Sequence, residues 1–248
     1  MILQALNRYY DRARNEAENE VPPYGFSVQR ISFCVVLEPD GTLYDIHDLR
    51  VPDGRRLKPV SLALPHPGGK RTSGIRPYFL WDKTDYVFGR NADTEAQGNK
   101  RKEDLLRKAF AAFRKLHLAM QERIQSEPYA AVCRFLEDWD PTQADALPYW
   151  PEMSGQNLVF LIRATSGYVH EDPEVREAWA RFLESRQKGP VARCLITNEL
   201  APIARTHAPI RNVRGGGGKA DKSIVSFNEK AFESYGKDQA YNAPVSQR

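Results

Sequence analysis

Apolar and polar positions alternate near the start of the chain, and this alternation predicts a β-hairpin. Over residues 27–38 every second position from Ile31 to Leu37 is apolar, which is the period of a strand with one buried face. The tripeptide Pro39-Asp40-Gly41 supplies a turn, and residues 42–49 form the returning strand. Further strands are predicted over residues 60–64, 157–164, 191–196 and 223–227.

A period of three to four residues predicts helices elsewhere. The clearest one covers residues 103–124, where apolar side chains recur along one face. His117 lies on that face, where we expect a hydrogen-bonded core histidine. Shorter helices are predicted over residues 1–19, 128–139 and 173–186. Asp172 is well placed to cap the last of these, because proline follows it at the first helical position.

Together these elements predict an α+β fold. We expect a β-rich core of antiparallel hairpins that carries two basic glycine loops, with a helical insert over about residues 103–140. The chain of 248 residues contains no internal repeat and is long enough to bury a large core. We interpret residues 1–248 as one recognition domain.

Positive charge is concentrated in two stretches, although the formal net charge is only +4. Seven cations stand against one acid between Arg50 and Trp81, and five stand against one between Leu200 and Lys222. These cations are Arg50, Arg55, Arg56, Lys58, Lys70, Arg71 and Arg76, then Arg205, Arg211, Arg214, Lys219 and Lys222. Such segregation is typical of a surface that binds a polyanion. Ordinary solvated loops are the alternative.

Each basic stretch contains a glycine-rich loop, residues 67–74 and residues 211–222, and the second has four consecutive glycines. Glycine lets a backbone approach a ligand closely, with amides and flanking cations aimed at anionic oxygens. The predicted DNA-binding residues are Lys70, Arg71, Thr72, Ser73, Arg76, Arg211, Asn212, Arg214, Lys219 and Lys222. Lysine and arginine suit phosphates, whereas the amide of Asn212 suits a base edge. For Thr72 and Ser73, ordinary turn chemistry remains open.

Tests for catalytic and metal-binding motifs fail. Neither Gly69-Lys70 nor Gly218-Lys219 completes a nucleotide-binding phosphate loop, because the following hydroxyl residue and the first glycine are missing. Cys194 and the distant His207 cannot supply the four ligands of a zinc site, so Cys194 is interpreted as a small buried residue in a strand. No nucleophile elbow or grouped set of carboxylates is present. We therefore expect no enzyme activity, no metal and no cofactor.

The cysteines and the first residues of the chain indicate the cellular compartment of the protein. Three cysteines, far apart in sequence, indicate free thiols in a reducing environment. The first residues lead into an amphipathic stretch rather than a signal peptide, and no apolar run approaches the roughly 20 residues of a membrane span. We expect a cytoplasmic protein without a membrane partner.

Several segments resemble one known family, the large subunit of the subtype I-C CRISPR Cascade surveillance complex. The resemblance begins with residues 1–6 and continues through the basic loop at 70–75 and the aromatic segment 79–82. It extends through residues 157–160, 194–197 and 202–205 to 225–228, 231–236 and 242–245. These segments span nearly the whole chain in the order expected of the family.

The resemblance implies a function. Such subunits recognise the protospacer-adjacent motif in double-stranded DNA, help to start R-loop formation and provide a landing site for a separate helicase–nuclease. Their partners are the guide-RNA ribonucleoprotein and other Cascade subunits, and base pairing supplies most of the sequence specificity. Family members continue into a C-terminal helical bundle, so the chain is expected to be the N-terminal portion. The alternative is a non-catalytic scaffold that binds the guide-RNA handle or neighbouring subunits, and a metal-dependent nuclease is a third hypothesis.

Overall fold

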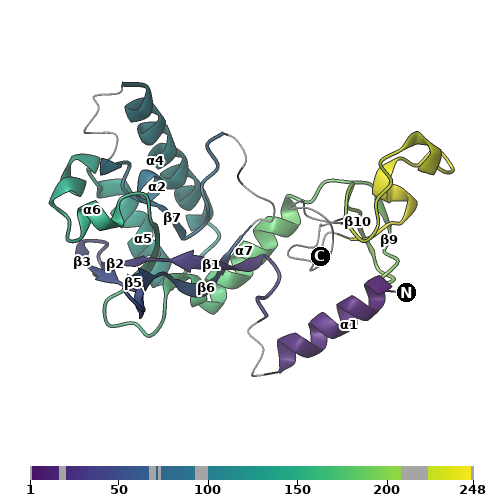
Figure 1. Ribbon diagram of the computed structural model, residues 1–248, viewed down its shortest axis with the longest axis horizontal. Coiled ribbons are helices and arrows are strands. Elements are labelled where there is room, and N and C mark those ends of the chain that lie inside the picture. The colour runs from purple at the N-terminus through teal and green to yellow at the C-terminus, as the bar shows by residue number, and fades with distance from the viewer. Residues whose placement is uncertain are drawn as a thin grey trace. The chain divides into compact units, whose positions relative to one another are not determined.

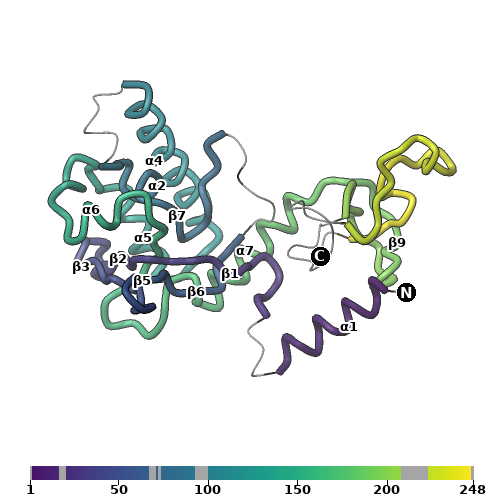
Figure 2. The backbone as a smooth tube through the Cα atoms, in the orientation of Figure 1, coloured from purple at the N-terminus to yellow at the C-terminus, as the bar shows by residue number. Residues whose placement is uncertain are grey.

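The computed structural model describes residues 2–16, 21–66, 71, 74–92, 100–207 and 223–246. The chain divides into two compact units, a finer division than the single domain expected from the sequence. One unit is Pro22–Leu183, and the other combines Met1–Val21 with Glu184–Arg248. Figure 1 labels the helices and strands, and Figure 2 follows the course of the backbone.

A four-stranded mixed sheet lies at the centre of the larger unit. Its strands are β2 (Phe33–Leu37), β3 (Leu43–Asp48), β7 (Trp81–Lys83) and β8 (Asn157–Ile162), in the order β3-β2-β8-β7. The β2–β3 and β7–β8 pairs are antiparallel, whereas β2 and β8 are parallel with Phe33 opposite Leu158. The α+β class is confirmed. The expected core of antiparallel hairpins is wrong at the β2–β8 pair, because the long chain segment between these strands allows a parallel return.

Both faces of this sheet are buried. Phe33, Val35 and Leu37 face a large apolar cluster, while Cys34 and Val36 face a smaller one. The large cluster includes α4 (Lys100–Gln121) and α5 (Glu127–Asp138), so the predicted helical insert packs on the sheet and forms much of its core (Figure 1). β8 is buried on both faces, which agrees with the unbroken apolar run of its residues 158–162.

The second face is covered by a separate antiparallel pair, β1 (Phe26–Ile31) and β6 (Val60–Pro65). The single strand predicted over residues 27–38 is therefore wrong, because the chain changes partner at Ser32. The Ser32 N–H donates to the Asn157 carbonyl at 3.1 Å, and its carbonyl accepts from the Leu49 N–H at 2.9 Å. Local alternation continues across this residue, so only the pairing of the strands reveals the break.

The predicted helices are observed with small shifts of their ends. Ser126 caps α5, and α7 (Pro173–Ser185) begins where Asp172 accepts a hydrogen bond from the Glu174 N–H at 2.8 Å. His117 is fully buried as expected. Its Nε2 accepts from the Leu80 N–H at 2.9 Å, while Nδ1 lies 2.8 Å from the Phe113 carbonyl. These bonds assign a neutral imidazole that donates from Nδ1, and burial lowers the pKa of His117 to about 4.

Short elements complete the larger unit. They are the hairpin strands β4 (Val51–Asp53) and β5 (Arg56–Lys58), the helices α2 (Thr84–Val87) and α6 (Trp150–Met153), and the 3-10 turns η1 (Pro141–Ala146) and η2 (Val169–Glu171). The turn between β2 and β3 is tight, because Gly41 has φ +93° and an added Cβ would lie 2.6 Å from Cβ of Arg134. Only glycine fits this position.

The smaller unit contains α1 (Ile2–Asn15), the antiparallel strands β9 (Val191–Arg193) and β10 (Leu200–Pro202), and the turns η3 (Lys230–Phe232) and η4 (Gln239–Asn242). The helix predicted at the start of the chain is confirmed. The strand predicted over residues 223–227 is wrong, because these residues form bends and irregular structure. Across the described segments, no helix combines the length and hydropathy needed to cross a membrane.

Candidate nucleic-acid interface

Two of the ten predicted DNA-binding residues, Arg71 and Arg76, belong to the described part of the chain. The other eight lie outside the described residues, so their grouping stays a prediction. They are Lys70, Thr72, Ser73, Arg211, Asn212, Arg214, Lys219 and Lys222.

Arg71 forms a bidentate ion pair with Asp82 of β7. Its Nη1 lies 3.1 Å from Oδ1 and its Nη2 lies 2.6 Å from Oδ2. The Asp82 side chain is only 1% exposed, and the Arg71 side chain is 19% exposed. Asp82 also accepts the backbone N–H groups of Tyr78 and Lys83, each at 2.9 Å. The carboxylate therefore receives four hydrogen bonds, which offset part of the cost of its burial, although burial still raises the pKa of Asp82.

Two tyrosines complete the surroundings of Arg71. Its guanidinium carbon lies 4.1 Å from the ring centroid of Tyr78 and 4.3 Å from that of Tyr86. Tyr78 stacks in turn on Trp81, with ring centroids 4.3 Å apart. Burial lowers the pKa of Arg71, but the ion pair with Asp82 more than offsets this and the pKa is raised. Arg71 is therefore fully charged and held among the core residues.

The ion pair with Asp82 gives Arg71 a structural role in addition to the predicted role in DNA binding. In the described conformation its guanidinium binds Asp82 and the tyrosines, so phosphate binding by the same group requires this ion pair to open. The contacts instead attach the chain at position 71 to β7, directly beside Lys70 and Thr72 in sequence. Arg76, by contrast, is exposed and forms no ion pair with another described residue.

The hairpin β4–β5 presents further cations. All six residues of its strands are exposed, and the pair forms a two-stranded sheet of its own. Asp53 and Lys58 form an ion pair across the hairpin. Arg55, in the turn, and Arg56, at the start of β5, form no ion pair with any other described residue. The hairpin thus displays two arginines on a narrow ribbon, and β-ribbons of this kind can enter a DNA groove.

Arg50 differs from these two arginines although it lies close in sequence. Its guanidinium binds Asp48 through Nε at 2.9 Å and Nη2 at 2.7 Å, and it lies 4.6 Å above the Phe33 ring. The basic stretch is therefore divided between cations that stabilise the fold, Arg50 and Arg71, and exposed ones, Arg55, Arg56 and Arg76. Sequence counting alone could not separate these two sets.

The sequence analysis counted Arg55 and Arg56 as basic residues but did not select them as contact residues. A signal for them was present in Gly54-Arg55, because glycine at the first position of a two-residue loop is typical of a hairpin turn. Gly54 has φ +61°, as such a turn requires, and an added Cβ would meet nothing within 4 Å. The combination of a turn signal with adjacent arginines would have predicted an exposed basic tip.

Cys194 and His207, which were considered above as possible metal ligands, both form hydrogen bonds within the smaller unit. Cys194 follows β9 and is buried, and its sulfur accepts the N–H groups of Ile196 and Ser246 at 3.4 and 3.3 Å. His207 lies 2.9 Å from the Ala243 carbonyl through Nε2. Within the described ranges, no three His, Cys, Asp or Glu side chains gather in a group that could hold a metal ion.

Comparison with known protein families identifies the chain. The profile of the family Cas_Csd1, described as CRISPR-associated protein, matches residues 6–248. The chain therefore belongs to this CRISPR-associated family of type I-C systems, as its sequence resemblance predicted. A search of curated proteins found no match.

Proposed function

We propose that the chain acts in a type I-C CRISPR surveillance complex, where it contacts double-stranded DNA at the protospacer-adjacent motif and helps to start R-loop formation. The observation that carries this proposal is the exposed β4–β5 hairpin with Arg55 and Arg56 at its tip. Family membership and the segregation of positive charge support it. The predicted contact residues outside the described segments, including Lys70 and Arg214, belong to the same proposal.

In this proposal the chain binds DNA and guide-containing partners but does not cut. Cleavage is left to a separate helicase–nuclease. Support comes from the sequence, which lacks a recognisable nucleophile or metal motif. Incubation of the purified chain with duplex DNA and Mg²⁺ or Mn²⁺ tests this part, and cleavage that a single carboxylate substitution abolishes would refute it.

The DNA-binding part is tested in the assembled complex with Arg55→Ala and Arg56→Ala. Gel-shift titrations compare a duplex carrying the cognate flanking motif with one in which only that motif is scrambled. A phosphate contact predicts equal weakening on both duplexes and a salt slope smaller by about one unit for each lost contact. A base contact predicts a loss of roughly 1–3 kcal/mol on the cognate duplex alone.

Lys115→Ala and Arg123→Ala provide the matched control, because both are exposed cations of the same unit outside the hairpin. If the hairpin variants bind both duplexes as tightly as these control variants do, the hairpin is not the DNA contact. If variants at Lys70 and Arg214 also leave discrimination between the two duplexes intact, the motif-reading proposal fails as a whole.

A further inference from the structure

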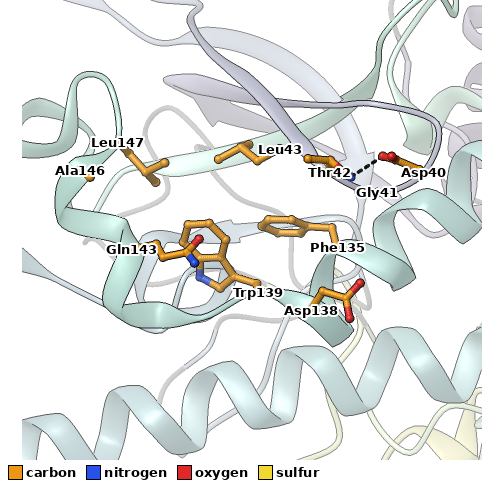
Figure 3. Close-up of a pocket in the computed structure, with 10 residues that line it drawn as sticks. All are labelled: Asp40, Gly41, Thr42, Leu43, Phe135, Asp138, Trp139, Gln143, Ala146 and Leu147. Carbon is orange, nitrogen blue, oxygen red and sulfur yellow. Dashed lines mark hydrogen bonds between the residues drawn. The ribbon is translucent and has the colours of Figure 1, made fainter.

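A pocket of about 550 Å³ lies on the larger unit, away from the basic residues described above. One wall is the β2–β3 turn, residues 40–43, and the other is the end of α5 with the following turn η1. Figure 3 shows the rings of Phe135 and Trp139 facing Leu43 and Leu147 across the pocket. The pocket is therefore lined by both apolar and polar side chains, from two parts of the chain that are distant in sequence.

The aromatic side of the pocket is rigid. Phe135 and Trp139 are 3% and 9% exposed, and their ring centroids are 5.4 Å apart. The Trp139 indole N–H donates to the Phe88 carbonyl at 3.1 Å, which fixes the orientation of the ring. On the opposite wall, Gly41 packs so closely on α5 that no side chain fits there. The pocket walls are thus held together by core contacts.

The rim of the pocket is acidic. The exposed carboxylates of Asp40 and Asp138 come from the two walls and lie toward the same end of the pocket in the view of Figure 3. Residues 135–147 include four acids, Glu137, Asp138, Asp140 and Asp145, and no lysine or arginine. Neither Asp40 nor Asp138 forms an ion pair with another described residue.

The neighbouring cations are already engaged. Arg134 donates to the Pro39 carbonyl at 2.7 Å and lies 3.7 Å from Glu127, and Arg90 pairs with Asp145 at 3.0 Å. Asp40 accepts the Thr42 N–H at 2.8 Å, and this bond lowers the pKa of its carboxyl group. Asp40 is therefore ionised at neutral pH, and the rim keeps its negative charge.

Carboxylates beside partly exposed apolar side chains suit a cation that is flat and has an apolar stem. Guanidinium binds carboxylates in a bidentate manner, and the carbons of an arginine stem pack on apolar surface. A nucleic-acid backbone is disfavoured, because its phosphates would meet two carboxylates of like charge. These properties favour a protein partner.

We propose that this pocket docks an arginine side chain presented by another CRISPR-associated protein. Asp40 and Asp138 bind the guanidinium, while the half-buried Leu43 and Leu147 contact its stem. The surface would thus bind protein, in contrast to the basic hairpin. The proposal rests on the geometry of the pocket and is independent of whether the hairpin reads a DNA motif.

Site-specific photo-cross-linking provides the first test. The residue p-benzoylphenylalanine replaces Gln143, an exposed lining residue, in the full chain, which is co-expressed with the other proteins of the proposed surveillance complex. Mass spectrometry should locate the cross-link on a peptide of one of those proteins, at or next to an arginine. Cross-links to nucleic acid or to a second copy of this chain, or the absence of any cross-link in the assembled complex, would overturn the proposal.

Charge reversal provides the second test. Asp138→Arg should weaken association with the cross-linked partner by about tenfold or more, as expected for a close interfacial charge pair. Replacing the identified arginine with glutamate should restore binding to this variant. Asp40→Asn should also weaken association, although the amide oxygen can still accept the Thr42 N–H.

Glu137→Arg is the matched control, because Glu137 is exposed and adjacent to Asp138 but does not line the pocket. Melting temperatures of both variants establish that they fold. Equal weakening by Glu137→Arg and Asp138→Arg, or no rescue by the partner substitution, would contradict docking in this pocket.

Discussion

At the scale of single residues, the larger unit depends on a few buried polar groups that are fully hydrogen-bonded. Asp82 receives two bonds from Arg71 and two from backbone N–H groups, and His117 connects α4 to the chain that leads into β7. Burying either side chain without its hydrogen-bond partners would cost free energy, and the partners offset that cost. Substitutions at these positions should therefore act through stability.

Asp82→Asn should reduce the free energy of unfolding by about 3–5 kcal/mol, because it leaves the guanidinium of Arg71 among core residues without its counter-charge. Urea denaturation measures this effect. Asp104→Asn is the matched control, since Asp104 pairs with Arg107 and Lys108 on the surface and its loss should cost much less stability than that of Asp82. Equal costs for the two variants would show that the Arg71–Asp82 pair is not structural.

Acidification should destabilise the larger unit through His117. Its pKa is lowered from 6.5 to about 4, so below pH 6.5 the unfolded chain binds a proton that the folded protein excludes. The stability present above pH 6.5 is lost as the pH falls toward 4, by about 2 kcal/mol at pH 5. Denaturation at a series of pH values measures this slope.

His117→Gln should remove about half of the slope between pH 6.5 and 5, because the buried His170, whose pKa is also lowered to about 4, contributes the rest. His47→Gln should leave the slope unchanged, because His47 is on the surface. If the His117→Gln protein keeps the original pH dependence, groups other than His117 cause the slope. Carboxylates have little influence on this comparison, because most of their titration occurs at lower pH.

At the scale of elements, two turns that each contain a glycine with positive φ have different surroundings. The β2–β3 turn packs on α5 and forms one wall of the pocket, whereas the β4–β5 turn has open space around it. The first turn is therefore part of the core, and the second is free to contact a ligand.

Gly41→Ala should cost more than Gly54→Ala, although both glycines have positive φ. An alanine Cβ at position 41 would lie within 3 Å of the Ala131 carbonyl oxygen and the Phe135 nitrogen, whereas at position 54 it meets nothing within 4 Å. We expect a loss of about 1 kcal/mol at Gly54 from backbone strain alone, and at least 2 kcal/mol more at Gly41. Thermal unfolding of the two variants is the measurement, and similar melting temperatures would disprove the close packing.

At the scale of the whole molecule, both apolar clusters lie entirely within residues 22–183. A polypeptide of these residues should therefore fold without the rest of the chain and unfold cooperatively. Circular dichroism during urea denaturation tests this, and Asp82→Asn should destabilise the fragment as much as the full chain. A fragment without a cooperative transition would show that the larger unit needs the remainder of the protein.

Element types could be predicted from the sequence to a large extent. The helices at 100–121, 127–138 and 173–185 and the β2–β3 hairpin follow from periodicity, which depends only on neighbouring residues. The break at Ser32 could not be found in this way, since the apolar alternation continues through it. The candidate site was predicted in outline as a basic region. Arg71, however, was assigned to DNA binding from its charge alone.

Composition and local pattern were thus sufficient for the fold class, the main helices and the segregation of charge, and the resemblance of sequence segments was sufficient for the family. Folding of the chain established which charges face inward. Arg71 meets Asp82 because a partner eleven residues away is buried on β7 with two backbone bonds of its own. Likewise, Asp40 and Asp138 border one pocket because the β2–β3 turn packs on α5. Such pairings depend on the spatial neighbours of a residue, and these neighbours are set by the packing of elements that are separate in the sequence.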